Sequence, residues 1–401
     1  MSSRRPFSSS FNYKRPLYRC FTGELFISVV LCLSQTRSSV AFCPSPLPLV
    51  TFPDNLFTPK HHKGLYAQEK QSGGVPQYEK IDMVLVKSES IAEGSQLWTL
   101  ELKQQPNKEV RIDEYKAGHV LAVEMEAPDN LSDGHTKEDA ARNGGWMRGP
   151  YTVVRCNVKG QAVQIIFKVV GEKTRSMANA KAGTPLRIGG KFQTPIVQGI
   201  FEAAGGKSDY DDLQQQPTRR VVLISTGVGV GPCIGAVEEY LELYQRGSSM
   251  IRSSSITNIH LAASFRTQTE IIESSHLNDL SEQSEGLFTW TPVITSTDGR
   301  LSDSVENLEK FGITPFNGDS GSSSRGGSNT YCCLSETHYH LIGNGQSVHE
   351  WQEGLEQAGV PKSRVTTEIY FNQRAKKDAH RVAEITAAIR AASTVSVHKA
   401  V

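Results

Sequence analysis

The sequence has few cysteines and no apolar run near its N-terminus long enough to cross a membrane. Three of its 7 cysteines lie before residue 50, and the other four are scattered: Cys156, Cys233, Cys332 and Cys333. These are too few for a disulfide framework and suggest no iron–sulfur centre. The apolar stretch Leu25 to Leu33 is far shorter than the about 20 residues of a membrane-spanning helix. We therefore expect no transmembrane segment in the mature protein and expect any one-electron carrier to be a separate protein.

Net charge is also nearly absent, but it is unevenly distributed. Residues 1–67 hold 8 Lys and Arg against 2 Asp and Glu, a net charge of +6, and the whole chain carries +1, so the remainder carries about −5. A mildly acidic body lacks the basic footprint of a nucleic-acid-binding protein. We expect no nucleic-acid partner.

The N-terminus has the features of a targeting segment. Basic residues precede Leu25 to Leu33, and the small residues Ser38 to Ala41 follow, which predicts a signal peptide over residues 1–41. Residues 42–77 begin with Phe42, are poor in acid and are broken by proline. This order resembles the bipartite presequences of algae with secondary plastids and implies a transit peptide and leader over 42–77 and a plastid (chloroplast) location. A plain signal peptide followed by a disordered leader is the alternative.

Residues 78–200 alternate short β-rich runs with polar segments. The expected strands are Met83 to Val86, Gln96 to Leu102, Val120 to Met125, Tyr151 to Val154 and Val163 to Val170. Short strands at this spacing predict a small barrel or sandwich. The polar stretch from Ala127 to Trp146 is too long for a hairpin turn, so we interpret it as a surface insertion.

Residues 219–372 follow a different rhythm after a Gly-, Asp- and Gln-rich linker at 201–218. Strands expected at Val221, Asn258, Phe288, His338 and Val365 alternate with helices expected at Cys233 to Gln245, Gln268 to Leu280 and Val348 to Ala358. Such alternation predicts a parallel sheet with helices on its faces. The Gly/Ser tract Phe316 to Asn329 is expected to be a loop. The tail at 373–401 should form an amphipathic helix over Lys376 to Ala392 that packs on its own domain.

Two glycine turns in this second region follow expected strands and precede expected helices. The first contains Gly227, Gly229 and Gly231 followed by Pro232, and the second is Gly343-Asn344-Gly345. Glycines let backbone amides approach a pyrophosphate at a helix start, and two such turns at the carboxyl ends of strands in one sheet form a ligand crevice. The alternative for the first turn is simple packing of a strand on a helix.

These motifs, with a final Glu-x-Tyr strand at Glu368 and Tyr370, resemble the ferredoxin reductase-like flavoproteins. The resemblance covers about residues 80 to 372 and implies an N-terminal antiparallel six-stranded β-barrel that binds FAD, followed by a Rossmann-like parallel-sheet domain that binds NAD(P)H. It also implies that Glu368 is a proton-relay residue and that Tyr370 stacks near the flavin, although Tyr370 could equally be a core residue.

The β-rich half carries its own part of the resemblance at Arg148, Tyr151 and Thr152. In this family an Arg-x-Tyr-Ser/Thr strand holds the flavin: the guanidinium binds the pyrophosphate, the phenol ring lies on the isoalloxazine, and the hydroxyl faces the reactive nitrogen. Here two residues separate Arg148 from Tyr151 where the family usually has one. Either the arginine or its loop must therefore shift, and a plain edge-strand arginine with a core tyrosine is the alternative.

Other candidate cofactor contacts are weaker as sequence. Thr174, Arg175 and Ser176 lie where the family places a short helix facing the flavin pyrophosphate, although a capped surface helix would look the same. Arg266 could select NADPH by binding the extra phosphate of that nucleotide. The other candidates for this role lie at the ends of the second and third expected strands: Ser264, Ser296 and Arg300.

The resemblance implies hydride transfer from NAD(P)H to bound FAD, and then electron transfer to a small-molecule or protein acceptor that the sequence does not identify. The alternative is a flavin- or nucleotide-binding plastid scaffold or redox sensor without turnover, which the Arg148 spacing and the insertion favour. We expect no metal site at Cys332, Cys333, His338 and His340, because adjacent cysteines lack a chelating separation and the alternate histidines fit one face of a strand.

Overall fold

The structure, a computed structural model, describes residues 78–92, 96–105, 112, 115–157, 161–204, 217–248, 255–300, 303, 305–313, 334–371 and 374–398. The expected signal and transit peptides, the loop at 316–329, residues 332 and 333 and most of the expected linker lie outside the described residues. Within the described part, no helix is both long and apolar enough to span a membrane.

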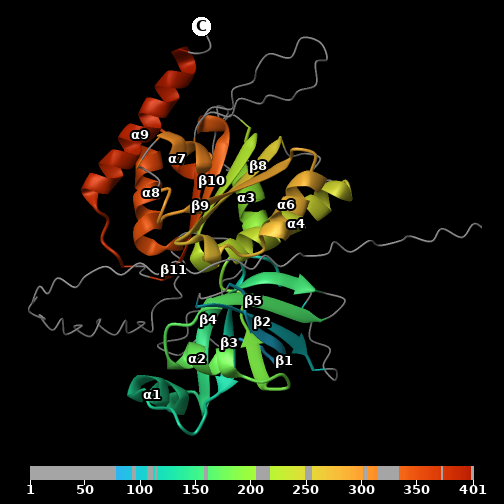
Figure 1. The fold of residues 1–401 in the computed structure, drawn as a ribbon. Helices are drawn as coiled ribbons and strands as arrows, with labels where there is room; N and C mark the ends of the chain where they lie inside the picture. The colour runs from blue at the N-terminus through green and yellow to red at the C-terminus, as the bar shows by residue number, and fades with distance from the viewer. Residues whose placement is uncertain are drawn as a thin grey trace, which may run out of the picture. The chain divides into compact units, whose positions relative to one another are not determined.

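The first half of the described chain is a closed six-stranded antiparallel barrel (Figure 1). Its strands are β1 (Lys80–Ser90), β2 (Leu97–Gln104), β3 (Val120–Glu126), β4 (Trp146–Asn157), β5 (Ala162–Lys168) and β6 (Pro185–Gly189). They pair in the order β1-β2-β5-β4-β3-β6, and β6 closes the barrel against β1. Because successive side chains of a strand point to opposite faces, Leu121, Val123 and Met125 of β3 all face the core. The expected barrel is confirmed, with β6 as a strand that the sequence did not predict.

Three helices lie between or directly after the barrel strands in the sequence: α1 (Gly134–Arg142), α2 (Glu172–Asn179) and α3 (Ile196–Ala204). The helix α1 lies within the stretch interpreted as a surface insertion and was not predicted. It begins at Asp133, whose carboxylate accepts hydrogen bonds from the backbone N–H groups of His135 and Thr136, each at 3.3 Å. Such capping satisfies amides that the first turn of a helix leaves unpaired.

The second half is a five-stranded parallel sheet in the order β11-β10-β7-β8-β9. Its strands are β7 (Arg220–Thr226), β8 (Asn258–Phe265), β9 (Phe288–Ile294), β10 (Thr337–Asn344) and β11 (Val365–Phe371). Every residue of β8 is buried, as expected for an inner parallel strand with both faces covered. The expected parallel sheet is confirmed.

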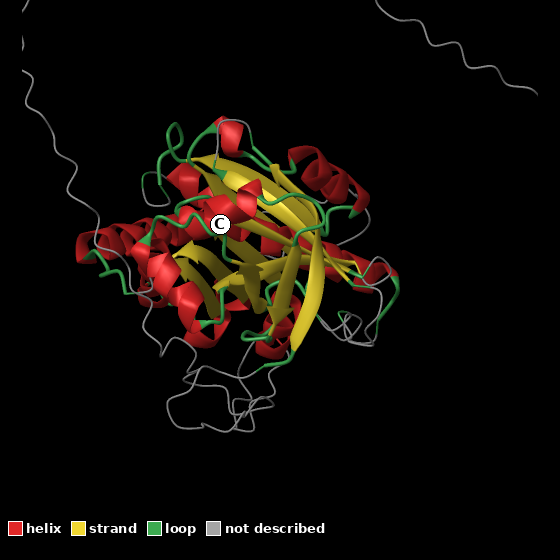
Figure 2. Cartoon of the chain, turned by 90° about the horizontal axis from the view of Figure 1, so that it is seen from below, coloured by secondary structure: helices red, strands yellow, loops and turns green. Residues whose placement is uncertain are grey.

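Helices cover both faces of this sheet (Figures 1 and 2). On one face lie α3, α4 (Val230–Gln245) and α6 (Ser274–Gln283), which share an apolar core with the sheet. On the other face lie α7 (Val305–Lys310), α8 (Gly345–Gln357) and α9 (Ala379–His398). Ile385 and Ile389 of α9 are buried in that second core, so the C-terminal helix packs on its own sheet as expected.

The helix α4 packs directly on the barrel strand β4, and glycine makes this possible. A Cβ atom at Gly235 would lie 1.7 Å from the carbonyl oxygen of Val154, and one at Gly231 would lie 2.8 Å from a methyl carbon of the same valine. Any side chain at these two positions would therefore force the helix away from the strand. Val154 and Ile166 of the barrel consequently belong to the same apolar core as α4.

An arginine reinforces this contact beside the glycines. Arg155 of β4 binds Glu238 of α4 through two hydrogen bonds of 2.6 and 2.7 Å, and it also binds Glu273, at the start of α6, at 2.9 Å. Burial opposes the charge of the guanidinium, but its bonds to Glu273 and Glu238 outweigh this and raise the pKa of Arg155. Two planar carboxylate contacts fix the direction of the arginine as well as its position.

We expect Gly235→Ala to destabilise the protein. Helix propensity alone favours alanine by roughly 1 kcal/mol, whereas the clash with the Val154 carbonyl should lower the free energy of unfolding by about 1–3 kcal/mol, as overpacking does. Chemical denaturation measures the difference. The matched control is Gly134→Ala in α1, where a Cβ would meet nothing within 4 Å. A Gly235→Ala protein as stable as the control would contradict the direct packing of α4 on β4.

Candidate functional site

The two glycine turns lie side by side at the carboxyl ends of β7 and β10. These strands are parallel neighbours, with Ser225 paired to Ile342. The backbone N–H of Asn344 donates a hydrogen bond to the Thr226 hydroxyl at 3.2 Å. Gly343 adopts φ +138°, and a Cβ there would lie 1.9 Å from the same hydroxyl oxygen. Only glycine therefore permits this close approach of the second turn to the first.

The residues of the first turn have different surroundings. Gly227 adopts the left-handed φ of +55°, and a Cβ there would meet nothing within 4 Å, so the space beside its Cα is open. A Cβ at Gly229 would lie 3.2 Å from Ile342 of β10, while Gly231 faces the barrel. Pro232 is buried in the first turn of α4, where its missing N–H costs no helical bond. The packing interpretation therefore applies to Gly229 and Gly231, and ligand approach at Gly227 stays a prediction.

A series of hydrogen-bonded side chains joins the barrel to the edge strand β11. Thr152 of β4 bonds with the phenol of Tyr370, and Tyr370 donates to a carboxyl oxygen of Glu368 at 3.1 Å. The side chains of Thr152 and Glu368 are buried, with 8% and 3% of their surface exposed. The structure therefore brings together three of the predicted site residues, one from the barrel and two from the sheet.

Burial changes the acid–base properties of this series. Desolvation raises the pKa of Glu368 to about 8, although the bond from Tyr370 opposes the shift. The buried thiol of Cys233, in the first turn of α4, bonds with Ser225, and burial and the neighbouring Glu368 raise its pKa. Near neutral pH, Glu368 is therefore an acid that can both hold and release a proton. Cys233 belongs to this neighbourhood but was not predicted; its place directly after Pro232 was the available signal.

Two buried histidines lie on the other side of Glu368. Nε2 of His340 in β10 is 3.7 Å from Oε1 of the Glu368 carboxyl. Both His338 and His340 contact the Thr366 hydroxyl, at 2.9 and 3.0 Å. Desolvation lowers the pKa of His338 to about 3 and that of His340 to about 4, so both rings are neutral. The sequence motifs indicate no metal site at these two histidines and no other role for them.

Arg148 and Tyr151 lie on opposite faces of β4. The unbroken pairing of β3 with β4 sets Glu124 opposite Arg148 and Leu121 opposite Tyr151, so three positions along a regular strand reverse the face. The Tyr151 ring packs in the barrel core near Phe167, and its hydroxyl contacts the Met177 sulfur at 3.0 Å. Arg148 shares the outer face with Thr152. The structure thus places Tyr151 away from the other two, and its contact with a flavin stays a prediction.

The guanidinium of Arg148 is available for an anion. It lies 4.9 Å from the centre of the Tyr78 ring, and no carboxylate of the described residues pairs with it. Across the strand pair, Glu124 binds Tyr78 at 3.0 Å and Lys80 at 2.9 Å instead. Arg148 therefore keeps its planar donors, which suit a phosphate group.

The start of α2 is engaged by the chain itself. The carboxylate of Glu172 accepts hydrogen bonds from the backbone N–H groups of Ser132 and Asp133 at 2.8 and 2.6 Å. The Thr174 hydroxyl accepts from the N–H of Gly171 at 3.0 Å and thereby caps its own helix. Arg175 is exposed and Ser176 half-buried. The insertion thus holds an acidic side chain at this helix start, and a role of Thr174, Arg175 and Ser176 in anion binding stays a prediction.

The remaining nucleotide candidate, Arg266, follows β8 and is exposed. Its backbone N–H donates to the Glu270 carboxylate at 2.9 Å, which fixes the turn and leaves the guanidinium toward solvent. Ser264 is buried, whereas Ser296 and Arg300 are exposed. Position therefore permits Arg266 to reach a ligand at the strand ends without requiring it.

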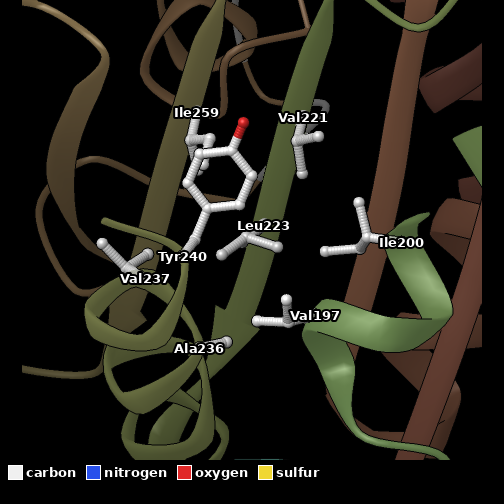
Figure 3. Close-up of a pocket in the computed structure, with 8 residues that line it drawn as sticks. All are labelled: Val197, Ile200, Val221, Leu223, Ala236, Val237, Tyr240 and Ile259. Carbon is white, nitrogen blue, oxygen red and sulfur yellow. The ribbon is translucent and has the colours of Figure 1, made fainter. Parts of the chain in front are cut away.

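Two other features of the described residues do not belong to this site. Glu238, Glu273 and His276 hold ligand-type atoms within 4.8 Å of one another, but Arg155 binds both carboxylates and supplies the positive charge. A cavity of about 10 Å³ lies between α3, α4 and the sheet, and Figure 3 shows the residues that line it. Its lining is apolar and includes Val197 and Tyr240. This volume is about that of one water probe, so the cavity cannot hold a nucleotide.

Comparisons with known proteins give structural similarity without sequence similarity. No family model and no curated protein matches the chain. A ferredoxin–NADP⁺ reductase from Neisseria gonorrhoeae with bound FAD and NADP is 15% identical, with a TM-score of 0.49, over 73% of this chain and 99% of that one. The ferredoxin–NADP⁺ reductase from Plasmodium falciparum with 2′P-AMP is 13% identical, with a TM-score of 0.47, over 73% and 96%.

A flavohemoglobin from Malassezia yamatoensis with bound FAD and heme is also similar. It is 16% identical, with a TM-score of 0.48 over 73% of this chain. The chain spans 60% of the length of that flavohemoglobin.

The buried ionisable groups predict a stability maximum near pH 6.5. The stability associated with protonated Glu368 is complete below pH 4.5 and is lost as the pH rises to about 8. The neutral buried histidines contribute stability that is complete above pH 6.5 and is lost as the pH falls toward their lowered pKa values. These pKa values are about 4 for His260, about 3 for His338 and about 4 for His340. Denaturation midpoints between pH 5 and 9 measure both limbs.

The variant Glu368→Gln should lose the fall in stability between pH 6.5 and 8. It should keep the fall in stability on the acid side of pH 6.5, because the substitution removes only the carboxyl and leaves the histidines unchanged. The exposed residue Glu309 provides the control, since Glu309→Gln should retain both limbs. If Glu368→Gln declined above pH 6.5 as the wild type does, Glu368 would not be the group that titrates there.

Proposed function

We propose that this protein is a flavin-dependent oxidoreductase that transfers hydride from NAD(P)H to bound FAD and then passes electrons to a small-molecule or protein acceptor of unidentified nature. The observation that carries the proposal is the series Thr152, Tyr370 and Glu368, which connects the outer face of the barrel with the edge of the sheet. Hydride transfer needs two ring systems brought together at a site with controlled proton transfer. This series supplies the proton-transfer groups at the place where the barrel meets the sheet.

The residues present fit FAD along the outer face of β4. Arg148 and Thr152 share that face, and the arginine has donors free for a pyrophosphate. The start of α2 fits a phosphate less well, because the Glu172 carboxylate already lies there. We therefore assign pyrophosphate binding to Arg148 and assign the flavin ring contact to Tyr370. Bound FAD would supply the redox chemistry itself.

The nicotinamide nucleotide is assigned to the two glycine turns. The space beside Gly227 in the first turn is open. The second turn, Gly343 to Gly345, lies against Thr226, which directly precedes Gly227. Backbone N–H groups at such helix starts favour an anion. Arg266 is the candidate for the additional phosphate of NADPH.

Glu368 is assigned the role of holding a proton. A carboxyl whose pKa is raised to about 8 can gain or lose a proton near neutral pH, which suits general acid–base catalysis. Tyr370 carries the proton between the Glu368 oxygen and the Thr152 hydroxyl, because each bond in the series can reverse its direction. Thr152 presents the last hydroxyl at the outer face of the barrel.

We also propose that the protein is delivered to plastids by residues 1–77, where a basic and apolar segment precedes Phe42 and a proline-containing, acid-poor stretch. The support is the order of these sequence features alone.

The redox proposal is tested by adding NADPH under nitrogen to the purified protein reconstituted with FAD. The yellow absorbance should bleach. Thr152→Ala should slow this reduction roughly 10- to 100-fold, because it removes a hydroxyl that moves a proton, without lowering the FAD content. Stopped-flow absorbance measures the rate.

Thr152→Ser is the matched control, since it keeps the hydroxyl and should reduce at close to the wild-type rate. An unchanged rate in Thr152→Ala would remove this residue from the mechanism. A wild-type protein that binds FAD but stays oxidised would instead be a scaffold or sensor, and one that stays colourless after reconstitution would contradict flavin binding altogether.

The location is tested with residues 1–70 fused to a fluorescent protein in an alga with secondary plastids. The fusion should enter plastids, and the Phe42→Ala version should not, because the aromatic residue marks the start of the transit peptide. Secretion of both fusions would leave only a signal peptide.

A further inference from the structure

The hydrogen-bonded series at Glu368 continues into the sheet through two strands. His338 and His340 are two residues apart on β10 and therefore point to the same face. Thr366 pairs with His340 across the β10–β11 register, and Glu368 is two residues further along β11. The Thr366 hydroxyl lies 2.9 Å from Nε2 of His338 and 3.0 Å from Nδ1 of His340. All four side chains consequently lie in one line on one face.

The chemistry of a hydroxyl couples the two imidazoles. Thr366 has a single O–H proton, so it donates to one ring and must accept an N–H from the other. When Thr366 donates to Nδ1 of His340, that neutral ring carries its proton on Nε2, which faces Glu368. When Thr366 donates to Nε2 of His338, the neutral ring of His340 has a bare Nε2 facing Glu368. The tautomers of His338 and His340 are therefore linked.

The two arrangements match the two forms of Glu368. A protonated Nε2 of His340 suits the carboxylate, and a bare Nε2 suits the carboxylic acid. The distance of 3.7 Å between Nε2 of His340 and Oε1 of Glu368 is longer than a hydrogen bond. A hydrogen bond of about 2.9 Å therefore requires the carboxyl to move toward the ring by roughly 1 Å or less. Its other oxygen meanwhile faces Tyr370. The carboxyl thus lies between two hydrogen-bonding partners.

Burial of these polar side chains costs free energy, so packing alone does not explain their presence. His338 and His340 lie beside Val221 and Leu223 of β7 in the register of the sheet, and both rings are almost completely buried. Within the described part of the chain, Nδ1 of His338 has no hydrogen-bond partner. A buried polar atom without a partner is unfavourable, and apolar side chains would fill the same face without this cost.

We propose that His338, Thr366 and His340 form a proton relay that returns a proton to Glu368 from the side opposite Tyr370. This inference rests on the proposed function, in which Glu368 gives up a proton toward Thr152. His338 and Thr366 act through His340, so they are positioning and relay residues that touch no cofactor.

The relay step balances without any redox partner. Water is the proton source: a hydronium ion gives its proton to Nδ1 of His338 and is left as a water molecule, while the proton on Nε2 of His338 moves to the Thr366 oxygen. The Thr366 proton moves to Nδ1 of His340, and the proton on Nε2 of His340 moves to Oε1 of Glu368. Both rings begin and end neutral with exchanged tautomers, and the carboxylate becomes a carboxylic acid.

Other charged and titratable groups also face this line. Tyr370 and the Cys233 thiol lie beside Glu368, and the Arg364 guanidinium is near His338. The arginine disfavours an imidazolium at His338, so a relay through neutral tautomers is preferred over one that stores positive charge in the ring.

The test follows the ring nitrogens of His338 and His340 by ¹⁵N NMR in the full chain without added nucleotide. Single histidine substitutions assign the signals. As the pH rises from 6 to 9.5 and Glu368 ionises, the protonated and bare nitrogens should exchange in both rings with one common midpoint. Glu368→Gln should abolish the exchange. Retention of one tautomer by His338 throughout the wild-type titration would overturn the relay.

Thr366→Val removes the coupling hydroxyl, so His338 should no longer follow Glu368. Thr366→Ser keeps the hydroxyl and should preserve the common midpoint, and Thr367→Val on the opposite face of β11 should leave both tautomer changes intact. A Thr366→Val protein in which His338 still follows Glu368 would also overturn the relay. These measurements need no FAD or NADPH, so they can succeed when the NADPH bleaching experiment fails, and the reverse.

Discussion

The backbone contact between α4 and the barrel strand β4 determines the geometry of the candidate site. Gly231 and Gly235 bring the helix onto Val154, and Val154 lies two residues from Thr152 on the same outer face. The same helix begins at the glycine turn and carries Cys233 beside Glu368. One close contact therefore sets the position of the barrel hydroxyl, the nucleotide turn and the edge of the sheet relative to one another.

Two polar systems near this contact differ in their physical character. Arg155, Glu238 and Glu273 are partly exposed and form ion pairs, which fasten the barrel strand to α4 and the start of α6. Glu368 and the histidines are buried and neutral near pH 7. Desolvation of a charge is costly where no opposite charge compensates it. Ion pairing thus serves the attachment of the two parts, while the interior keeps groups that exchange protons without carrying charge.

Much of the fold could be predicted from the sequence, because a strand such as β7 contains a continuous apolar run and is followed by a glycine turn. The short strand β6 and the helix α1 were missed, since five residues give little periodicity and the insertion is polar. For the site, the turns and the Glu368 strand were predictable as local motifs. The face of Tyr151 was not, because it depends on an unbroken register with β3. The neighbours of His340 depend on pairing between distant strands, which no local pattern encodes.

The register of β4 leaves its outer face without an aromatic ring between Arg148 and Thr152. Pro150 occupies that place and is exposed, whereas the Tyr151 ring lies inside the barrel against Phe167 and Met177. A planar ligand held by Arg148 and Thr152 would rest on an aliphatic ring, and β4 would supply no aromatic cover for it.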